Sequence, residues 1–323
     1  MKRADTLARA AVSAAATFAG ALALCQAATA QAWPTRPIRM IVPAAAGGST
    51  DIGARQVARL MSVELGQPVV VDNKGGRRRA IGRSGGRARG TGWIHADLYA
   101  LLPATSKSIN YDPLKSFASA GAVFWYSTLL VCNPKVPFSD LAGYINYAKA
   151  NPGKLNIATA GLGSGNHFSS ELLSQMAGIK VTHVPYKGNA PAVQDVMGGA
   201  ADCIQMGEAK SYLDGGRLKV LATTGKARDP RFPNVRTVDE QGLKGFDATW
   251  WQGVFAPAGT PPEVMAKVTA AVRKATEDPS TKATMFDAGF VPEFVPPAQL
   301  ARRIQGDMTK FHKIASDTGI ELE

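Results

Sequence analysis

Two loops rich in glycine and serine are the parts of this sequence best suited to hold a small anion. The first loop, 44–50, follows the apolar stretch Pro37–Val42 and precedes a segment with helical spacing, 51–65. Glycine lets backbone approach a ligand, and a helix start offers unpaired N–H groups at the positive end of its dipole. The pattern predicts an anion-binding loop, with an ordinary glycine-rich turn as the alternative. Its candidate ligand-binding residues are Ala46, Gly47, Gly48, Ser49 and Thr50.

The second loop joins the short apolar stretch Leu155–Ala158 to a further segment with helical spacing, 168–176. It offers hydroxyl, amide and imidazole groups together with several backbone N–H groups. One such loop is weak evidence, but two loops at equivalent strand–helix junctions could hold one small carboxylate between them. The candidate residues of this loop are Thr159, Ala160, Gly163, Ser164, Asn166 and His167.

Two further turns follow apolar stretches and supply four more candidates. Tyr186 and Lys187 stand in a tight turn, where Tyr186 could line a cleft or pack in the core. Lys187 could contact an acidic ligand or remain in solvent. Gly207 and Glu208 follow Asp202–Gln205, and Glu208 would suit an ammonium or hydroxyl group of a ligand. The acidic and histidine residues show no metal-ligand spacing, so we expect neither a metal nor another cofactor.

An exported hydrolase is an alternative, with Ser164 as nucleophile and His167 as base. The sequence around Ser164 lacks the Gly-x-Ser-x-Gly turn of many hydrolases, because Leu162 and Asn166 occupy the outer positions. His167 also has no evident carboxylate partner nearby, so a catalytic triad is disfavoured.

The elements that would position these loops follow a strand–loop–helix–strand order that recurs along the chain. This order is typical of α/β proteins with parallel strands, in which ligands bind beyond the carboxyl ends of the strands. Asp51 falls in the first turn of its helix, where we expect a capping or structural acid. Ser139 is the expected cap of a helix over 140–150, and Trp250–Ala256 reads as an extended aromatic run. Further helices are expected at 190–197, 262–276, 280–288 and 297–316.

Composition limits the class of protein. The 323 residues are 45% apolar and 19% charged, which allows a sizeable core and two lobes. Residues 1–32 have the basic start, apolar stretch and small residues of a secretory signal peptide. Cys25 would be lost with this leader, and a lipid anchor on it is the less favoured alternative. Cys132 and Cys203 could form a disulfide after export or remain as free buried thiols.

Several segments resemble the Bug family, the extracytoplasmic substrate-binding subunits of tripartite tricarboxylate transporters. They occur in the family's order and span nearly the whole chain after the leader. The segments are Trp33–Asp51, Leu65–Asn73, Ala150–Asn156, His183–Gly188, Gly215–Ala222 and Phe255–Pro261.

The resemblance implies an α/β, two-lobed periplasmic binding protein of the Venus flytrap type (type II), with a parallel or mixed sheet in each lobe. We expect lobe 1 to comprise 33–132 and 247–323, and lobe 2 to comprise 133–246. The family implies a non-catalytic protein that binds a di- or tricarboxylate, an acidic amino acid or an aromatic acid, and we expect the protein to be a monomer. Its other partners would be the membrane subunits of the transporter, which closure around the ligand would engage. No nucleic acid is expected as a partner.

Segment 75–102 departs from this resemblance. Six arginines and no acidic residue occur between Arg77 and Arg89, where relatives have a small-residue turn and an alanine-rich helix. The leader contributes +2 and these arginines +6, which leaves +4 of the formal charge of +12. Codons for residues 92–96, read one base later, can spell the family's Asp-Gly-Tyr-Thr-Leu. We therefore interpret the segment as a local frameshift that would cost lobe 1 a helix, a strand and part of a ligand loop. The alternative is a genuine basic segment of an envelope protein that binds nucleic acid or anionic lipid.

Overall fold

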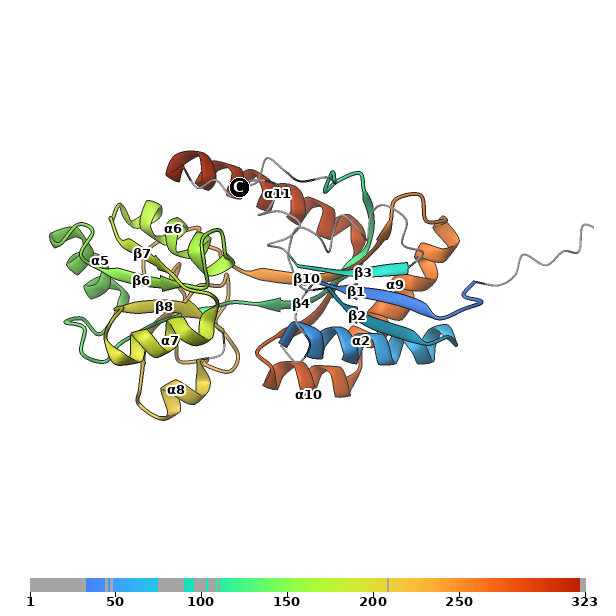
Figure 1. The fold of residues 1–323 in the computed structure, drawn as a ribbon, viewed down its shortest axis with the longest axis horizontal. Coiled ribbons are helices and arrows are strands. Elements are labelled where there is room, and N and C mark those ends of the chain that lie inside the picture. The colour runs from blue at the N-terminus through green and yellow to red at the C-terminus, as the bar shows by residue number, and fades with distance from the viewer. Residues whose placement is uncertain are drawn as a thin grey trace, which may run out of the picture. The chain divides into compact units, whose positions relative to one another are not determined.

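Apolar strands form two sheets in the computed structural model, which describes residues 33–43, 46, 49–74, 90–95, 103, 109, 111–207 and 209–319. The larger sheet is mixed: β1 runs parallel to β2 and β3, whereas β10 is antiparallel to β3 and β4, and β11 to β4. Among the described residues this sheet has six strands (Figure 1), in the order β11 (Val291–Val295), β4 (Phe117–Tyr126), β10 (Trp250–Pro257), β3 (Gly90–His95), β1 (Ile38–Val42) and β2 (Val69–Asn73).

The smaller sheet is also mixed. Strand β6 is parallel to β7 and β8, so the carboxyl ends of these strands meet at one edge, while β5 runs antiparallel to β8 and β9. Its five described strands have the order β7 (Thr182–Pro185), β6 (Asn156–Thr159), β8 (Cys203–Met206), β5 (Leu129–Cys132) and β9 (Lys219–Thr223).

Helices cover both sheets through apolar faces. Within the described residues, α2 (Ser49–Leu65), α9 (Pro262–Glu277) and α10 (Pro279–Asp287) pack with the larger sheet. Residues of α5 (Leu141–Ala150) and α6 (Gly165–Ala177) form a core on one face of the smaller sheet, and those of α7 (Asn189–Gly198) and the short α8 (Lys210–Asp214) pack on the other. Strands covered on both faces need nearly continuous apolar residues, and β5 and β8 are buried throughout.

The chain crosses between the sheets twice within the compact unit Ile38–Glu323. The first crossing, at residues 127–128, joins β4 directly to β5, and the second leads from β9 to β10. Hydroxyl groups link the two crossings, because Thr128 Oγ1 lies 2.7 Å from Thr224 Oγ1 and Ser127 Oγ lies 3.1 Å from Thr223 Oγ1. Sequence analysis placed the first crossing near Cys132, but β5 pairs with β8 and β9, so Leu129–Cys132 belongs to the smaller sheet.

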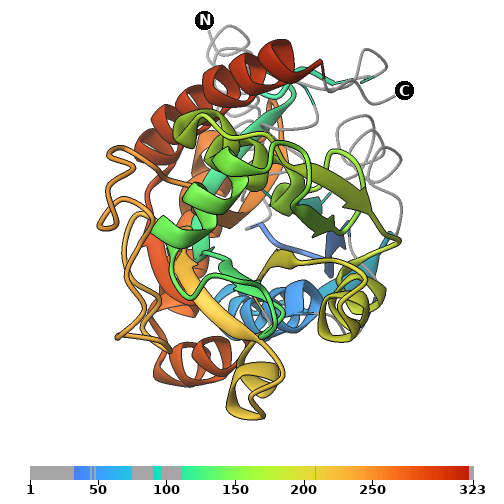
Figure 2. The same ribbon diagram turned by 90° about the vertical axis from the view of Figure 1, so that its left-hand side faces the viewer.

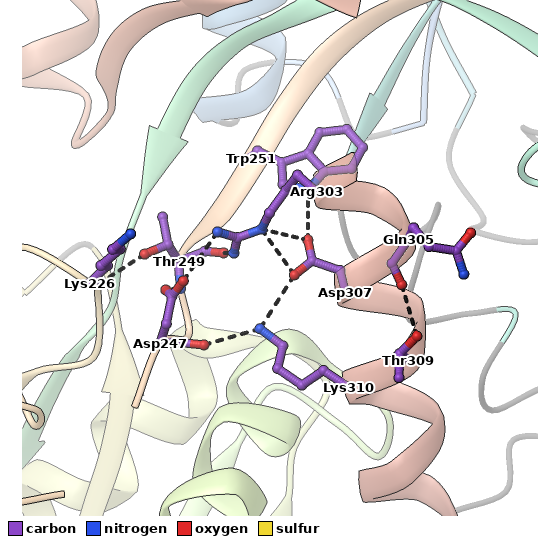
Figure 3. Close-up of polar contacts among 9 residues, drawn as sticks. All are labelled: Lys226, Asp247, Thr249, Trp251, Arg303, Gln305, Asp307, Thr309 and Lys310. Atoms are coloured by element: carbon purple, nitrogen blue, oxygen red, sulfur yellow. Dashed lines mark hydrogen bonds and ion pairs between the residues drawn. The ribbon is translucent and has the colours of Figure 1, made fainter. Parts of the chain in front are cut away.

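The last described helix, α11 (Pro297–Thr318), anchors the second crossing. Arg303 donates to Asp247 Oδ2 over 3.1 Å and to the carbonyl oxygen of Thr249 over 2.8 Å, and Lys310 donates to the carbonyl oxygen of Asp247 over 3.0 Å (Figure 3). The helix also packs against α6 of the smaller sheet, beside which it lies in Figure 2. One helix therefore contacts both the crossing and the smaller sheet.

Local details differ from the sequence predictions in two places and agree with them in a third. Asp140, rather than Ser139, caps α5, because its carboxylate accepts a hydrogen bond from Gly143 N over 2.7 Å. Helix α6 begins at Gly165, three residues before the predicted start, so the second glycine-rich loop supplies its first turn. Asp51 is a structural acid as expected: it is buried and accepts hydrogen bonds from Arg55 and Asn73.

The presence of strand β3 changes what we expected of segment 75–102. Residues 90–95 form this strand, which pairs with β1 and β10, so the strand that we expected to be lost is present. Extended backbone needs ladder partners more than a particular side-chain pattern, and β1 and β10 supply them. The six arginines of 77–89 lie outside the described residues, and the frameshift remains a proposal that gene sequencing can test.

Cys132 and Cys203 form a disulfide that joins directly opposed positions of β5 and β8. This finding decides between the two thiol states that the sequence left open. Residues 1–32, including Cys25, lie outside the described part of the chain. In the described part, none of the helices combines the length and apolar character that crossing a membrane requires.

Candidate ligand-binding site

A cavity of about 260 Å³ lies where loops of the two sheets meet. The larger sheet and its helices contribute residues of α2, β4 and β10 and the loop after α10. The smaller sheet contributes the β6–α6 loop, the start of α7 and the end of β8. The described residues that line the cavity are Thr50, Tyr126, Thr128, Ala160, Ser164, Gly165, Asn166, Asn189, Gln205, Met206, Gly207, Trp250, Gln252, Ala288, Gly289 and Phe290.

The described lining is polar but uncharged. Its polar side chains are hydroxyl and amide groups, and its apolar walls come from Met206, Trp250 and Phe290. No Lys, Arg, His, Asp or Glu is among these described lining residues. An anion in this cavity would therefore be held by neutral hydrogen-bond donors and by backbone dipoles, as at other helix-terminus anion sites.

The first turn of α6 forms one wall of the cavity. Ser164 has extended backbone angles (φ −76°, ψ 158°) before the helix begins, and the next two residues also line the cavity. The first N–H groups of a helix lack partners within it and carry partial positive charge. Gly165 fits against Trp250, since a Cβ atom at this glycine would lie only 3.1 Å from Trp250 Cζ2. The absence of a side chain here lets the helix start reach the cavity.

Asn166 fixes the shape of the loop before α6. Its Oδ1 accepts a hydrogen bond from Ala160 N over 3.1 Å and lies 2.6 Å from Ser164 Oγ, while its Nδ2 donates to Asn189 Oδ1 over 3.2 Å. Ser164 Oγ also lies 2.6 Å from the carbonyl oxygen of Gly161. These contacts hold the loop closed on itself and join it to the start of α7.

The structure brings five of the predicted site residues to the cavity wall, whereas the other described ones do not line it. Thr159 is buried in β6, Tyr186 donates from its hydroxyl to Asp195 Oδ2 over 2.8 Å, and Lys187 is exposed. Gly47, Gly48, Glu208 and the side chain of Ser49 lie outside the described part, and the described Ala46, Gly163 and His167 are not among the lining residues. The five at the wall are Thr50, Ala160, Ser164, Asn166 and Gly207.

Sequence reasoning missed several lining residues, of which Gln205 and Gln252 are the most informative. Each is an amide residue inside an otherwise apolar strand, and each is only 1% exposed. An isolated glutamine within a buried strand is a usable signal, because burying its amide costs free energy unless another group pairs with it. Phe290 and its neighbours follow α10 and carry no such signal.

The hydrolase alternative finds no support in the positions of Ser164 and His167. The hydroxyl of Ser164 faces Gly161 and Asn166, whereas Nδ1 of His167 accepts a hydrogen bond from Gly163 N over 3.1 Å. A nucleophile needs a hydrogen bond to its base, and the described contacts of these two side chains go elsewhere.

A cluster of three titratable side chains lies behind this loop. Sequence analysis found no carboxylate partner for His167, but Glu171, one helical turn further along α6, places Oε1 3.9 Å from His167 Nε2. His183 on β7 places Nδ1 3.2 Å from the same oxygen, and its Nε2 lies 3.0 Å from Ser170 Oγ. The contact between α6 and β7 is tertiary, so residue spacing could not reveal it.

The environment of this cluster shifts two pKa values downward. Burial, and then the neighbouring His183, lower the pKa of His167 to about 4, although Glu171 acts in the opposite direction. Burial of Glu171 opposes its charge, but the hydrogen bond from His183 and the attraction of both imidazoles lower its pKa overall. At neutral pH we therefore assign a neutral His167 beside an ionised Glu171.

The hydrogen bond to His167 disfavours a metal ion at this cluster. The three ligand atoms of His167, Glu171 and His183 lie within 4.8 Å of one another, a separation that a metal could bridge. A metal on Nε2 of a neutral imidazole requires the proton on Nδ1, where metal-bound histidines donate a hydrogen bond. Nδ1 of His167 instead accepts from Gly163 N, so two N–H groups would collide.

We predict that acid destabilises the protein through His167. An unfolded chain protonates this imidazole near pH 6.5, whereas the folded chain resists protonation until about pH 4. The unfolded state therefore binds more protons between these values, and the free energy of unfolding falls by up to about 3 kcal/mol as pH drops through the window. Urea unfolding between pH 7 and 4 measures this fall.

A substitution separates the contribution of His167 to the pH dependence of the unfolding free energy from the contributions of other titratable groups. His167→Gln should flatten the pH dependence between 6.5 and 4, because glutamine does not titrate. The same substitution at His312, on the exposed side of α11, is the matched control and should leave the dependence unchanged. Equal pH slopes for His167→Gln and the unmodified chain would contradict the assignment.

A second cavity, of about 390 Å³, lies beside the crossings and has charged residues in its lining. Its guanidinium groups are already paired: Arg228 contacts Glu240 at 2.9 Å, and Arg303 contacts Asp247 and Asp307. A carboxylate ligand would have to compete with these internal carboxylates. The uncharged cavity is therefore the better candidate for an anion.

Comparisons with known proteins agree with the family resemblance found in the sequence. Residues 53–320 match the family model described as the tripartite tricarboxylate transporter family receptor. The chain is 33% identical to protein BugT of Bordetella pertussis over 308 residues, which are 91% of this chain and 93% of that protein.

Two solved structures similar to this chain contain small carboxylates. The Rhodopseudomonas palustris protein Rpa4515, solved with adipate, has 28% identity and a TM-score of 0.78, covering 90% of this chain and 99% of its own. MatC from the same organism, solved with bound malate, has 30% identity and a TM-score of 0.74, covering 87% and 99%.

Proposed function

We propose that this chain, which belongs to the tripartite tricarboxylate transporter receptor family, binds a small organic acid outside the cytoplasm and delivers it to a membrane transporter. Members of this family are solute-binding proteins. What we propose here is the chemical class of the solute. The classes that we consider are di- and tricarboxylates, acidic amino acids and aromatic acids.

The observation that supports a carboxylate most directly is the start of α6 in the cavity wall. Gly165 and Asn166 bring the N-terminus of a 13-residue helix to a cavity that is lined by uncharged donors. The helix start carries partial positive charge, and no fixed cation is among the described lining residues. Such a site suits a carboxylate that must later be released. The adipate and malate in the two related structures support the same class of ligand.

We further propose that the ligand is held between two lobes that close on it. Lobe 1 would comprise 33–128 and 247–323 and lobe 2 would comprise 129–246, since the strand Leu129–Cys132 pairs within the smaller sheet. Closure would create the surface that the membrane subunits recognise, and the protein would act as a monomer. The signal peptide of 1–32 would direct export to the periplasm.

Ligand-induced stabilisation tests the proposed function. In a thermal-shift screen of small organic acids, at least one should stabilise the chain by about 2.7 kcal/mol at 100 times its dissociation constant. Nuclear magnetic resonance of the same mixture should show the acid chemically unchanged after prolonged incubation. If every class of acid leaves the melting temperature unchanged, the proposed function is wrong.

A substitution at Gly165 tests the position of the site. In Gly165→Val the new side chain would press on Trp250 and fill the helix start, so we expect binding to weaken at least about tenfold, or ~1.4 kcal/mol. Gly198→Val is the matched control, because a Cβ atom there meets no neighbour within 4 Å. Isothermal titration of both variants with the best acid makes the comparison, and equal affinities would place the ligand elsewhere.

A further inference from the structure

Gln205 carries a buried amide that the described structure leaves unpaired. The residue is 1% exposed and lines the cavity, yet neither Nε2 nor Oε1 has a hydrogen-bond partner among the described residues. Buried polar groups in proteins are nearly always paired, and an unpaired one is expensive to maintain. An unpaired donor and acceptor at a cavity wall therefore indicate a group that arrives with the ligand.

A second unpaired group lies beside Gln205, behind the residues that line the cavity. Strand β8 pairs with β6 through Ala158 and Ile204, so the next residues along the ladder, Thr159 and Gln205, are neighbours on one face. Thr159 is 0% exposed, and its Oγ1 also lacks a partner in the described structure. Adjacent strands thus place an unpaired hydroxyl beside an unpaired amide at the carboxyl ends of β6 and β8.

The chemistry of an amide restricts what can satisfy it. Gln205 offers one acceptor oxygen and two N–H donors in one plane, and it is fully paired only by a group that both donates and accepts. A carboxylate can accept from Nε2 but leaves Oε1 facing a negative charge. No cation among the described lining residues would offset that repulsion.

We infer that the ligand has two different ends: a carboxylate held at the start of α6, and an uncharged carboxamide group that pairs with Gln205. The ligand class is therefore a small monoamide of a dicarboxylic acid, with about four to six carbon atoms to suit a cavity of this size. This inference rests on the proposed function, which it narrows from carboxylates in general.

Isosteric pairs of acids test the inference, since a monoamide and its diacid differ only in one terminal group. We expect the unmodified chain at pH 7.5 to bind succinamate or adipamate at least about tenfold more tightly than succinate or adipate. In Gln205→Leu this preference should vanish, because the amide that discriminates is gone. Gln305→Leu, the same change at an exposed position of α11, should keep the preference.

Stability of the ligand-free variant gives an independent readout. Leucine in place of an unpaired amide should leave the melting temperature of Gln205→Leu unchanged or raise it. A marked fall would show that the amide has partners in the folded chain, and would overturn the inference.

Isothermal titration of the acid pairs distinguishes the two possible failures. If the diacids bind as tightly as their monoamides, or if Gln205→Leu retains the preference, the inference is wrong and the proposed function stands. If the unmodified chain binds none of these acids and no acid of the wider thermal-shift screen, both are wrong.

Discussion

Replacing Asp307 with alanine is expected to lower the free energy of unfolding by about 3 to 5 kcal/mol, the cost of removing one partner from a buried ion pair. Asp307 is 3% exposed, accepts hydrogen bonds from Trp251 Nε1 and Arg303 Nε, each over 3.0 Å, and forms an ion pair with Lys310 at 3.4 Å (Figure 3). Without it, Asp247 would be the one carboxylate partner left to the guanidinium of Arg303 among the described residues. The melting temperature should fall by roughly 10 °C.

The pKa of Arg303 shows how strongly its carboxylate partners stabilise the charged guanidinium. Burial opposes the charge of this guanidinium, but the attraction of Asp307 and Asp247 outweighs burial and raises the pKa of Arg303. The side chain therefore stays charged in the variant, with one of its two carboxylate partners removed.

An exposed ion pair on the same helix provides the control. Lys313 and Asp317 are four residues apart at 2.7 Å, with side chains 75% and 41% exposed. Asp317→Ala should cost no more than about 0.5 kcal/mol. Urea or thermal unfolding of both variants makes the comparison, and similar losses at the two positions would show that Asp307 has no special role.

Loss of the Cys132–Cys203 disulfide is expected to cost about 4 kcal/mol. The bond closes a loop across a sequence separation of 71 residues, and releasing that loop raises the entropy of the unfolded chain. The chain-entropy estimate for a loop of this length gives ~4.4 kcal/mol at 25 °C. Urea unfolding with and without a reductant measures the difference.

A double substitution checks that the reductant acts on this bond. Cys132→Ala with Cys203→Ala should show a lowered unfolding midpoint that no longer responds to reductant. The unmodified chain in reductant should approach the stability of the variant, apart from the packing lost with two buried sulfur atoms. An unmodified chain whose midpoint ignores complete reduction would contradict the prediction.

The sequence predicted the class of fold well, because that class depends on local patterns. The recurring strand–loop–helix order placed most helices within a few residues of their observed bounds, including α9 and α11. The comparisons confirm the predicted family and the predicted periplasmic-binding-protein fold. Strand β4 was missed because small residues, among them Ser119 and Gly121, interrupt its first half, although Val123–Tyr126 has the composition of a typical strand. Its extended state comes from pairing with β10 and β11.

The candidate site was predictable only where one loop supplies it. Ser164 and Asn166 could be identified because the glycine-rich loop before a helix is a local pattern. Tyr126, Gln252 and Phe290 join the cavity through the packing of segments far apart in sequence, which residue spacing does not encode. The partner of His167 was missed for a different reason: the predicted helix began at Phe168, which left His167 outside it, whereas α6 begins at Gly165 and puts Glu171 one turn after His167.

The position of α11 has a consequence for the order of synthesis. Arg303 and Lys310 anchor the second crossing, and Phe311 stacks on Trp250 and packs edge-on against Phe168 of α6. A ribosome makes α11 after every element that it contacts here, so the second crossing lacks this anchor while those elements emerge. Until α11 is made, the nascent polypeptide lacks these contacts, which favours the unfolded state that threading through a secretion channel needs in the proposed export.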